Sequence, residues 1–85
     1  KGTKTITLSS LTPAGTGSNW KDYKIELTSL YPYHYMTPIV MVNFNYAFTN
    51  GVIKTEVTDG VLYVYVRIGN DVPADTIKMN YQILN

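Results

Sequence analysis

Two dipeptides near the middle of the chain, Asn50-Gly51 and Asp59-Gly60, constrain the fold more than any other feature. Each is a strong signal for a two-residue hairpin, because a type I′ turn needs positive φ at both of its central residues. Together they predict a run of three antiparallel strands joined by two tight turns. The predicted strands cover residues 39–49, 52–58 and 61–68.

The register that these turns impose would sort the side chains onto two faces. Three apolar pairs would share one face: Phe44 with Val57, Phe48 with Ile53, and Val57 with Leu62. The other face would carry five charged or tyrosine side chains: Lys54, Glu56, Tyr63, Tyr65 and Arg67. On that face the register places Tyr63 opposite Glu56 and Tyr65 opposite Lys54, with Arg67 opposite Val52. An apolar face beside a polar one is typical of an antiparallel sheet that covers a core on one side.

The rest of the chain predicts three more strands and no convincing helix. Polar and apolar residues alternate over residues 4–9, 20–29 and 76–84. Residues rich in Gly, Pro, Asn or Tyr predict loops over 11–19, 30–37 and 69–74. A single sheet of six strands would leave an apolar face exposed, so the strands must divide into two sheets. The sequence therefore predicts an all-β fold, a six-stranded antiparallel β-sandwich.

Length and composition limit what such a domain can use for stability and binding. The 85 residues predict one domain, 1–85, and we expect it to be part of a longer polypeptide because it starts at Lys1-Gly2. The absence of cysteine excludes disulfides and thiolate metal sites, which leaves oligomerisation as the stabilising device open to a small domain. A net charge of +1 argues against nucleic acid as a partner. No apolar run approaches the roughly 20 residues of a membrane helix, so we expect no membrane insertion.

The start of the segment 39–49 is apolar on both faces. Val40 and Val42 alternate with Ile39 and Met41, before Asn43 turns the second face polar. A strand that is apolar on both faces is normally covered on both. The pattern predicts a cover for this end of the strand, either from the same chain or from a neighbouring subunit.

Signatures of catalysis are missing, and we expect neither enzymatic activity nor a cofactor. The chain has no Gly-x-Ser-x-Gly elbow, no phosphate-binding glycine loop and no His-Glu-x-x-His motif. Glu26 and Glu56 lie in the middle of predicted strands beside lysines, which favours solvated ion pairs over a glycosidase acid pair. A turn containing Asn70, Asp71 and Asp75 could supply oxygen ligands to calcium, or could use its side chains for Asx hydrogen bonds.

Eight tyrosines, against two phenylalanines and one tryptophan, point to surfaces that are half buried and half wet. Two groups qualify as candidate ligand or interface residues. The first is the outward stripe Lys54, Glu56, Tyr63, Tyr65 and Arg67, and the second is the loop group Tyr31, Tyr33, His34 and Tyr35. Three interpretations stay open for the stripe: a face that stacks on sugars, a subunit interface, or ordinary cross-strand pairing on a sheet surface.

The order of the segments resembles a small β-sandwich of bacteriophage tail fibres and other virion appendages, and it also looks like the H-type lectin domains. The matching segments are KTITLSSLTPAGTGSNWKDYKIELTSL, TPIVMVNFNYAF, VTDGVLYVYVRIGN and TIKMNYQIL. The resemblance covers nearly the whole chain as a pattern of strands, and no sugar-contacting residue of the lectins has a clear match. It implies a homotrimeric, extracellular and non-enzymatic module.

We therefore expect a virion structural module with a virion or extracellular location. It would belong to a tail fibre or receptor-binding domain, or to a capsid decoration or head-fibre protein. Its expected partners are copies of itself, with a trimer favoured, other virion proteins and, on the host, cell-surface glycans. The alternative is a carbohydrate-binding module of a secreted bacterial protein.

Overall fold

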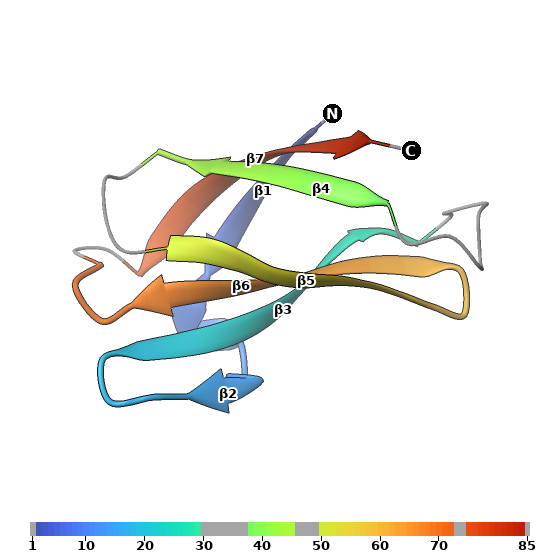
Figure 1. Ribbon diagram of the computed structural model, residues 1–85. Coiled ribbons are helices and arrows are strands. Elements are labelled where there is room, and N and C mark those ends of the chain that lie inside the picture. Colours follow the sequence, from blue (N-terminus) through green and yellow to red (C-terminus); the bar gives the residue numbers. More distant parts are fainter. Residues whose placement is uncertain (1, 30–37, 46–49, 73–74, 85) are drawn as a thin grey trace.

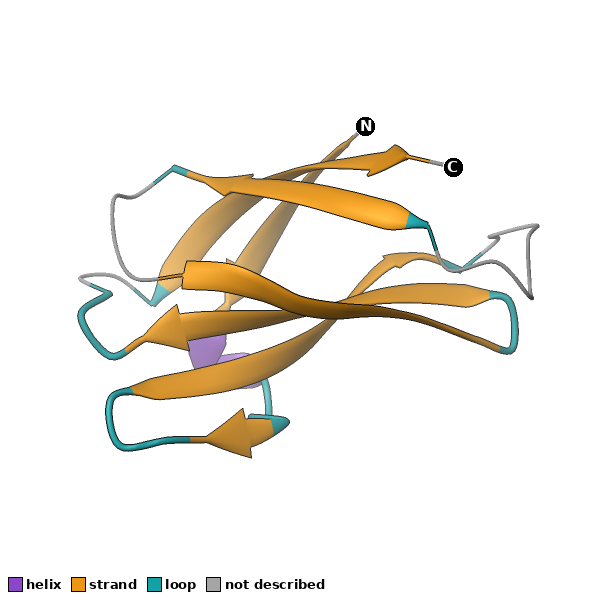
Figure 2. Ribbon diagram, in the orientation of Figure 1, coloured by secondary structure: helices purple, strands orange, loops and turns teal. Residues whose placement is uncertain are grey.

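Two antiparallel sheets make up the fold in the computed structural model, which describes residues 2–29, 38–45, 50–72 and 75–84 (Figures 1 and 2). Sheet A has the strand order β1 (Gly2–Thr7), β7 (Thr76–Leu84) and β4 (Ile39–Phe44). Sheet B has the order β2 (Gly15–Thr16), β3 (Trp20–Thr28), β6 (Val61–Gly69) and β5 (Asn50–Thr58). A single 3-10 turn, η1 (Leu8–Ser10), follows β1. The predicted all-β class and the division into two sheets are confirmed.

The core lies between the inner faces of the two sheets. On β6, the central long strand of sheet B, Leu62, Val64 and Val66 are completely buried. Ile77 and Met79 of β7 oppose them from the centre of sheet A. Each such side chain contributes about 1.5–3 kcal/mol by leaving water. The alternation of the sequence therefore fixes which side of each central strand faces the core.

The described residues form seven strands, where the sequence predicted six. The additional strand, β2, lies in the predicted loop 11–19 and pairs with Lys21 and Asp22 of β3. The backbone N–H of Gly17 donates to the carbonyl of Trp20 at 2.9 Å, which closes the turn between the two strands. Backbone pairing over two residues needs no apolar alternation, so the pattern gave no sign of it. The predicted strand 4–9 is also shifted by two residues, to Gly2–Thr7, because the chain turns into η1 after Thr7.

The hairpin at Asp59-Gly60 is confirmed. These residues have φ angles of 52° and 76°, the left-handed conformation that a type I′ turn requires. The register beyond this turn is also as predicted: Val57 lies opposite Leu62, Glu56 opposite Tyr63 and Lys54 opposite Tyr65.

The prediction of a hairpin at Asn50-Gly51 was wrong. Both residues lie within β5, where Asn50 pairs with Ile68 and Gly51 with Arg67. β4 pairs instead with β7 in the other sheet, so Phe44 lies opposite Met79 and not Val57. The apolar faces of two successive strands can meet across a core as well as side by side in one sheet. Here β4 belongs to sheet A and β5 to sheet B, so their apolar faces do not lie side by side. The remaining predicted pair, Phe48 with Ile53, includes a residue outside the described ranges.

A register shift in β5 corrects one further pair. The pairing with β6 skips from Val52 to Lys54, which leaves Ile53 as an extra residue of a β-bulge. Arg67 therefore lies opposite Gly51, and Val52 opposite Val66, one residue away from the prediction. Both Val52 and Ile53 are exposed at this edge of the sheet.

Candidate functional site

The outer face of sheet B gathers charged and aromatic side chains from its three long strands. We call this surface the tyrosine face, and its members are Trp20, Asp22, Lys24, Lys54, Glu56, Tyr63, Tyr65 and Arg67. The structure brings together all five residues of the predicted stripe, because β5 and β6 turn them to the same side. The other predicted group, Tyr31, Tyr33, His34 and Tyr35, lies outside the described residues.

One half of the tyrosine face is built around Lys24. Its ammonium group lies 4.2 Å from the centroid of the Tyr63 ring and 3.4 Å from Oε1 of Glu56. The same Glu56 oxygen accepts a hydrogen bond of 3.1 Å from the hydroxyl of Tyr65. Lys54, from β5, lies 4.5 Å from the centroid of the Tyr65 ring. Two cations, two rings and one carboxylate therefore form a continuous set of contacts across β3, β6 and β5.

The other half is built around Arg67. Its Nε and Nη2 donate to the two carboxylate oxygens of Asp22 at 2.9 and 3.3 Å, a bidentate ion pair between strands that pair directly. The guanidinium carbon also lies 3.7 Å from the centroid of the Trp20 ring. Below that ring runs Gly17, where a Cβ atom would come within 2.1 Å of the indole. A glycine is needed there because the ring occupies the space of a side chain.

The electrostatics of the tyrosine face favour its charged forms. The hydrogen bond from Tyr65 is the main cause that lowers the pKa of Glu56, and Lys24 adds to it. Desolvation works against the charge of Lys24, but Glu56 and Tyr65 outweigh it and raise the pKa of the ammonium. The hydrogen bonds with Asp22 raise the pKa of Arg67. The arrangement therefore favours the charged forms of Glu56, Lys24 and Arg67.

Trp20, Asp22 and Lys24 were not among the predicted site residues. Their alternation marked one side of the segment 20–29 as polar, but no local turn indicated that β3 pairs with β6. The signal that could have found them is the complementarity of the segments 20–28 and 61–69. When the two are aligned in antiparallel order, Asp22 lies opposite Arg67 and Lys24 opposite Tyr65.

The outer face of sheet A has a different character at one end. Ile39 is 68% exposed, Met41 57% and Leu84 38%. Ile39 lies directly opposite Leu84, so these side chains adjoin each other on β4 and β7. We call the three residues the apolar end of sheet A. Among the described residues, nothing shields Ile39 or Met41 from solvent, so a cover from the same chain is not seen there.

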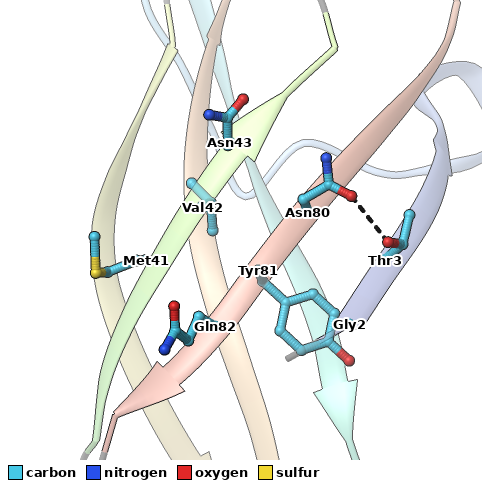
Figure 3. A pocket seen from close by; sticks show the side chains of 8 residues that line it. All are labelled: Gly2, Thr3, Met41, Val42, Asn43, Asn80, Tyr81 and Gln82. Atoms are coloured by element: carbon cyan, nitrogen blue, oxygen red, sulfur yellow. Dashed lines mark hydrogen bonds between the residues drawn. The ribbon is translucent and has the colours of Figure 1, made fainter.

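A shallow trough runs beside the apolar end (Figure 3). It has a volume of about 390 Å³ and is lined by Thr3, Met41, Asn43, Asn80 and Gln82, with Gly2, Val42 and Tyr81 completing its wall. The hydroxyl of Thr3 donates to the amide oxygen of Asn80 at 2.8 Å, a bond that links β1 to β7. We call this feature the amide trough. Its lining carries amides and a hydroxyl but no formal charge.

The structure gives Asp75 a role other than the calcium site considered from the sequence. Its carboxylate accepts two hydrogen bonds of 2.8 Å, from the backbone N–H and the hydroxyl of Ser9. These bonds tie η1 to the start of β7. Within the described ranges, no three His, Cys, Asp or Glu side chains gather as metal ligands, and no helix is long and apolar enough to cross a membrane.

Comparisons of the chain with protein-family models, with curated proteins and with solved structures find no match. The two outer faces and the residues that they expose are therefore the features of the chain that bear on its function.

Proposed function

We propose that the chain is a non-enzymatic structural module of a virion that assembles as a homo-oligomer. It would serve in a tail fibre or receptor-binding domain, or in a capsid decoration or head-fibre protein. The single observation that supports assembly is the apolar end of sheet A, where large apolar side chains adjoin one another in solvent. Contiguous exposed apolar surface commonly marks a protein–protein contact. The virion setting and the preference for a trimer come from the resemblance of the strand order.

The energetics of the apolar end favour association. Burying a side chain such as Ile39 or Met41 in a partner contributes up to about 1.5–3 kcal/mol. A net charge of +1 gives little repulsion between copies.

The test compares the solution mass of two variants by light scattering. We expect the wild type to have a multiple of the chain mass of 9.6 kDa, with three copies favoured, and Ile39→Lys with Met41→Lys to lower that mass by removing the contact at the apolar end. Thr12→Lys with Thr16→Lys is the matched control, because it adds the same two charges at exposed positions outside sheet A. A wild type that is monomeric at its highest soluble concentration would refute assembly.

The amide trough favours a second candidate, a carbohydrate-binding module that contacts cell-surface glycans. Side-chain amides both donate and accept hydrogen bonds, which suits the hydroxyls of an uncharged sugar. Met41 adds an apolar surface for the C–H face of the ring. A volume of about 390 Å³ lies within the range of small-molecule sites.

A glycan array with the purified chain tests this candidate. Asn43→Ala with Gln82→Ala would remove two amides from the trough and is expected to abolish binding. Asn19→Ala removes an exposed amide from the loop before β3 and should leave binding intact. No binding by the wild type would exclude the carbohydrate-binding function and leave assembly standing.

A further inference from the structure

β5 forms one margin of sheet B, and it is the least buried of the long strands. It pairs with β6 on one side only, and no residue of the strand is fully buried. Among the described residues, no backbone hydrogen bond is made from the other side of Thr55 or Val57. β5 is the last strand in the order of sheet B, and in Figure 1 it lies on the side of that sheet toward β4. A free edge of this kind presents a row of N–H and C=O groups that can pair with another strand.

The hydrogen bonds of sheet B show which residues of β5 face this edge. The carbonyls of Trp20 and Asp22 accept bonds from Gly17 and Ala14, so the even-numbered residues of β3 face away from β6. The odd-numbered residues of β3 therefore bond to even-numbered partners on β6, such as Val66 and Val64.

The odd-numbered residues of β6 must then face β5. Lys54 and Glu56, opposite Tyr65 and Tyr63, use their backbone groups toward β6. Thr55 and Val57 direct their N–H and C=O groups to the free edge.

The sequence at this edge is complementary to itself in antiparallel order. If two copies of β5 pair about Thr55, Lys54 of each copy lies opposite Glu56 of the other, and Thr55 lies opposite Thr55. The two threonines then form a hydrogen-bonded pair, which is the pairing that the phase of the strand requires. Opposite charges and paired threonines across strands are both stabilising.

We propose that β5 pairs with β5 of a second copy of this chain, which joins two four-stranded sheets into one continuous sheet across a two-fold axis. The same patch is used on both copies, as a two-fold contact requires. Beyond Lys54 the bulge ends regular pairing, and the exposed Val52 and Ile53 meet Thr58 and Val57 of the other copy. This contact lies on a different surface from the apolar end of sheet A, and it does not depend on it.

Two other pairings of the free edges of sheet B fit less well. A register centred on Glu56 would place two carboxylates opposite each other. β5 could also pair with the part of β3 that β2 leaves uncovered, but the side chains would not match. On β3 the residues whose backbone groups face the free edge, Lys24 and Glu26, have side chains on the outer face of the sheet. On β5 the edge-facing residues Thr55 and Val57 have inward side chains, so the two faces of a joined sheet would not match.

A single proline substitution at the edge of β5 gives the first test. Thr55→Pro removes an N–H that sheet B does not use, and edge strands tolerate proline in that orientation. The experiment is sedimentation equilibrium of the full chain carrying Ile39→Lys and Met41→Lys, so that the apolar end contributes nothing. We expect twice the chain mass of 9.6 kDa without Thr55→Pro, and the monomer with it. Circular dichroism confirms that the strands persist.

A charge exchange gives the second test and does not depend on proline. In the same background, Lys54→Glu alone would oppose two carboxylates twice across the axis, and Glu56→Lys alone would oppose two ammonium groups twice. Each is expected to weaken the dimer about tenfold. Mixing the two variants restores both opposite pairs and should restore the dimer, whereas mixing Lys54→Glu with the unexchanged chain restores only one. Equal masses in all samples, or no gain on mixing, would overturn the β5 contact and leave the apolar end untouched.

Discussion

The two outer faces of the molecule differ in how their side chains are satisfied. On the tyrosine face of sheet B, the ammonium of Lys24 has a ring and a carboxylate within reach, and Arg67 has both Asp22 and the Trp20 ring. On sheet A, Ile39 and Met41 stand in solvent. The face with the most conspicuous residues is thus the one that pairs within the chain. The face with ordinary aliphatic residues is the one that lacks a partner.

This difference follows from strand length and register. Three strands of nine residues lie side by side in sheet B, so each long polar side chain finds one on the next strand. In sheet A the strand β4 has six residues and forms the margin, so its outer side chains have a neighbour on one side only. We therefore base the proposed contact on exposure and not on residue type.

The largest expected effect on stability comes from removing the two tyrosines of this face. Tyr63→Ala with Tyr65→Ala takes away two half-buried rings that lie between the lysines, and we expect a loss of about 2 kcal/mol in the free energy of unfolding. Urea denaturation measures it. Ile39→Ala with Met41→Ala is the matched pair on sheet A, and it should change the stability of the dissociated chain, measured at low concentration, by less than about 0.5 kcal/mol. The contrast between the faces fails if the two double variants lose the same stability.

A smaller loss is expected where Gly17 supports Trp20. In Gly17→Ala the new Cβ would displace the indole from Arg67, at a cost of about 1 kcal/mol for overpacking. The fluorescence of Trp20, the only tryptophan of the chain, should shift at the same time. Gly51→Ala is the control, because a Cβ there meets nothing within 4 Å. Equal stability of both alanine variants would show that the stacked ring contributes nothing.

The smallest effect is the dependence of stability on pH. The pKa of Glu56 is lowered in the folded chain, so its contribution is present above the ordinary pKa of 4.5 and is lost as pH falls through the folded value. Burial raises the pKa of Tyr23, with Asp75 adding to it, so stability falls as pH rises above its ordinary value of 10. Denaturation across the pH range should show a shallower acid limb for Glu56→Gln than for the wild type. An unchanged acid limb would mean that the carboxylate is not held by Tyr65 and Lys24.

Much of the fold could be predicted from the sequence because its signals are local. The turn at Asp59-Gly60 depends on two residues, and the register that follows from it placed Lys54 and Glu56 opposite the correct tyrosines. The equally strong dipeptide at Asn50-Gly51 gave a wrong prediction, because an Asn-Gly pair can also lie at the start of a strand. Local preference cannot tell these cases apart without knowing which strand lies alongside.

The long-range pairs could not be predicted in this way. β3 and β6 are separated by more than thirty residues, so no turn fixes their register. Asp22 and Lys24 therefore joined the tyrosine face only in the structure. The exposure of Met41 was hidden for the same reason, since the alternation of the segment 39–49 shows that both faces are apolar but not which one the core covers.

The contrast between the two faces is tested most directly by measuring the solution mass of two variants beside the wild type. For Ile39→Lys with Met41→Lys, we predict a fall in mass, with the unfolding free energy of the dissociated chain, measured at low concentration, nearly unchanged. For Tyr63→Ala with Tyr65→Ala, we predict the wild-type mass with a reduced unfolding free energy. A tyrosine variant that loses assembly while keeping its stability would contradict this, and would place the assembly contact on the outer face of sheet B.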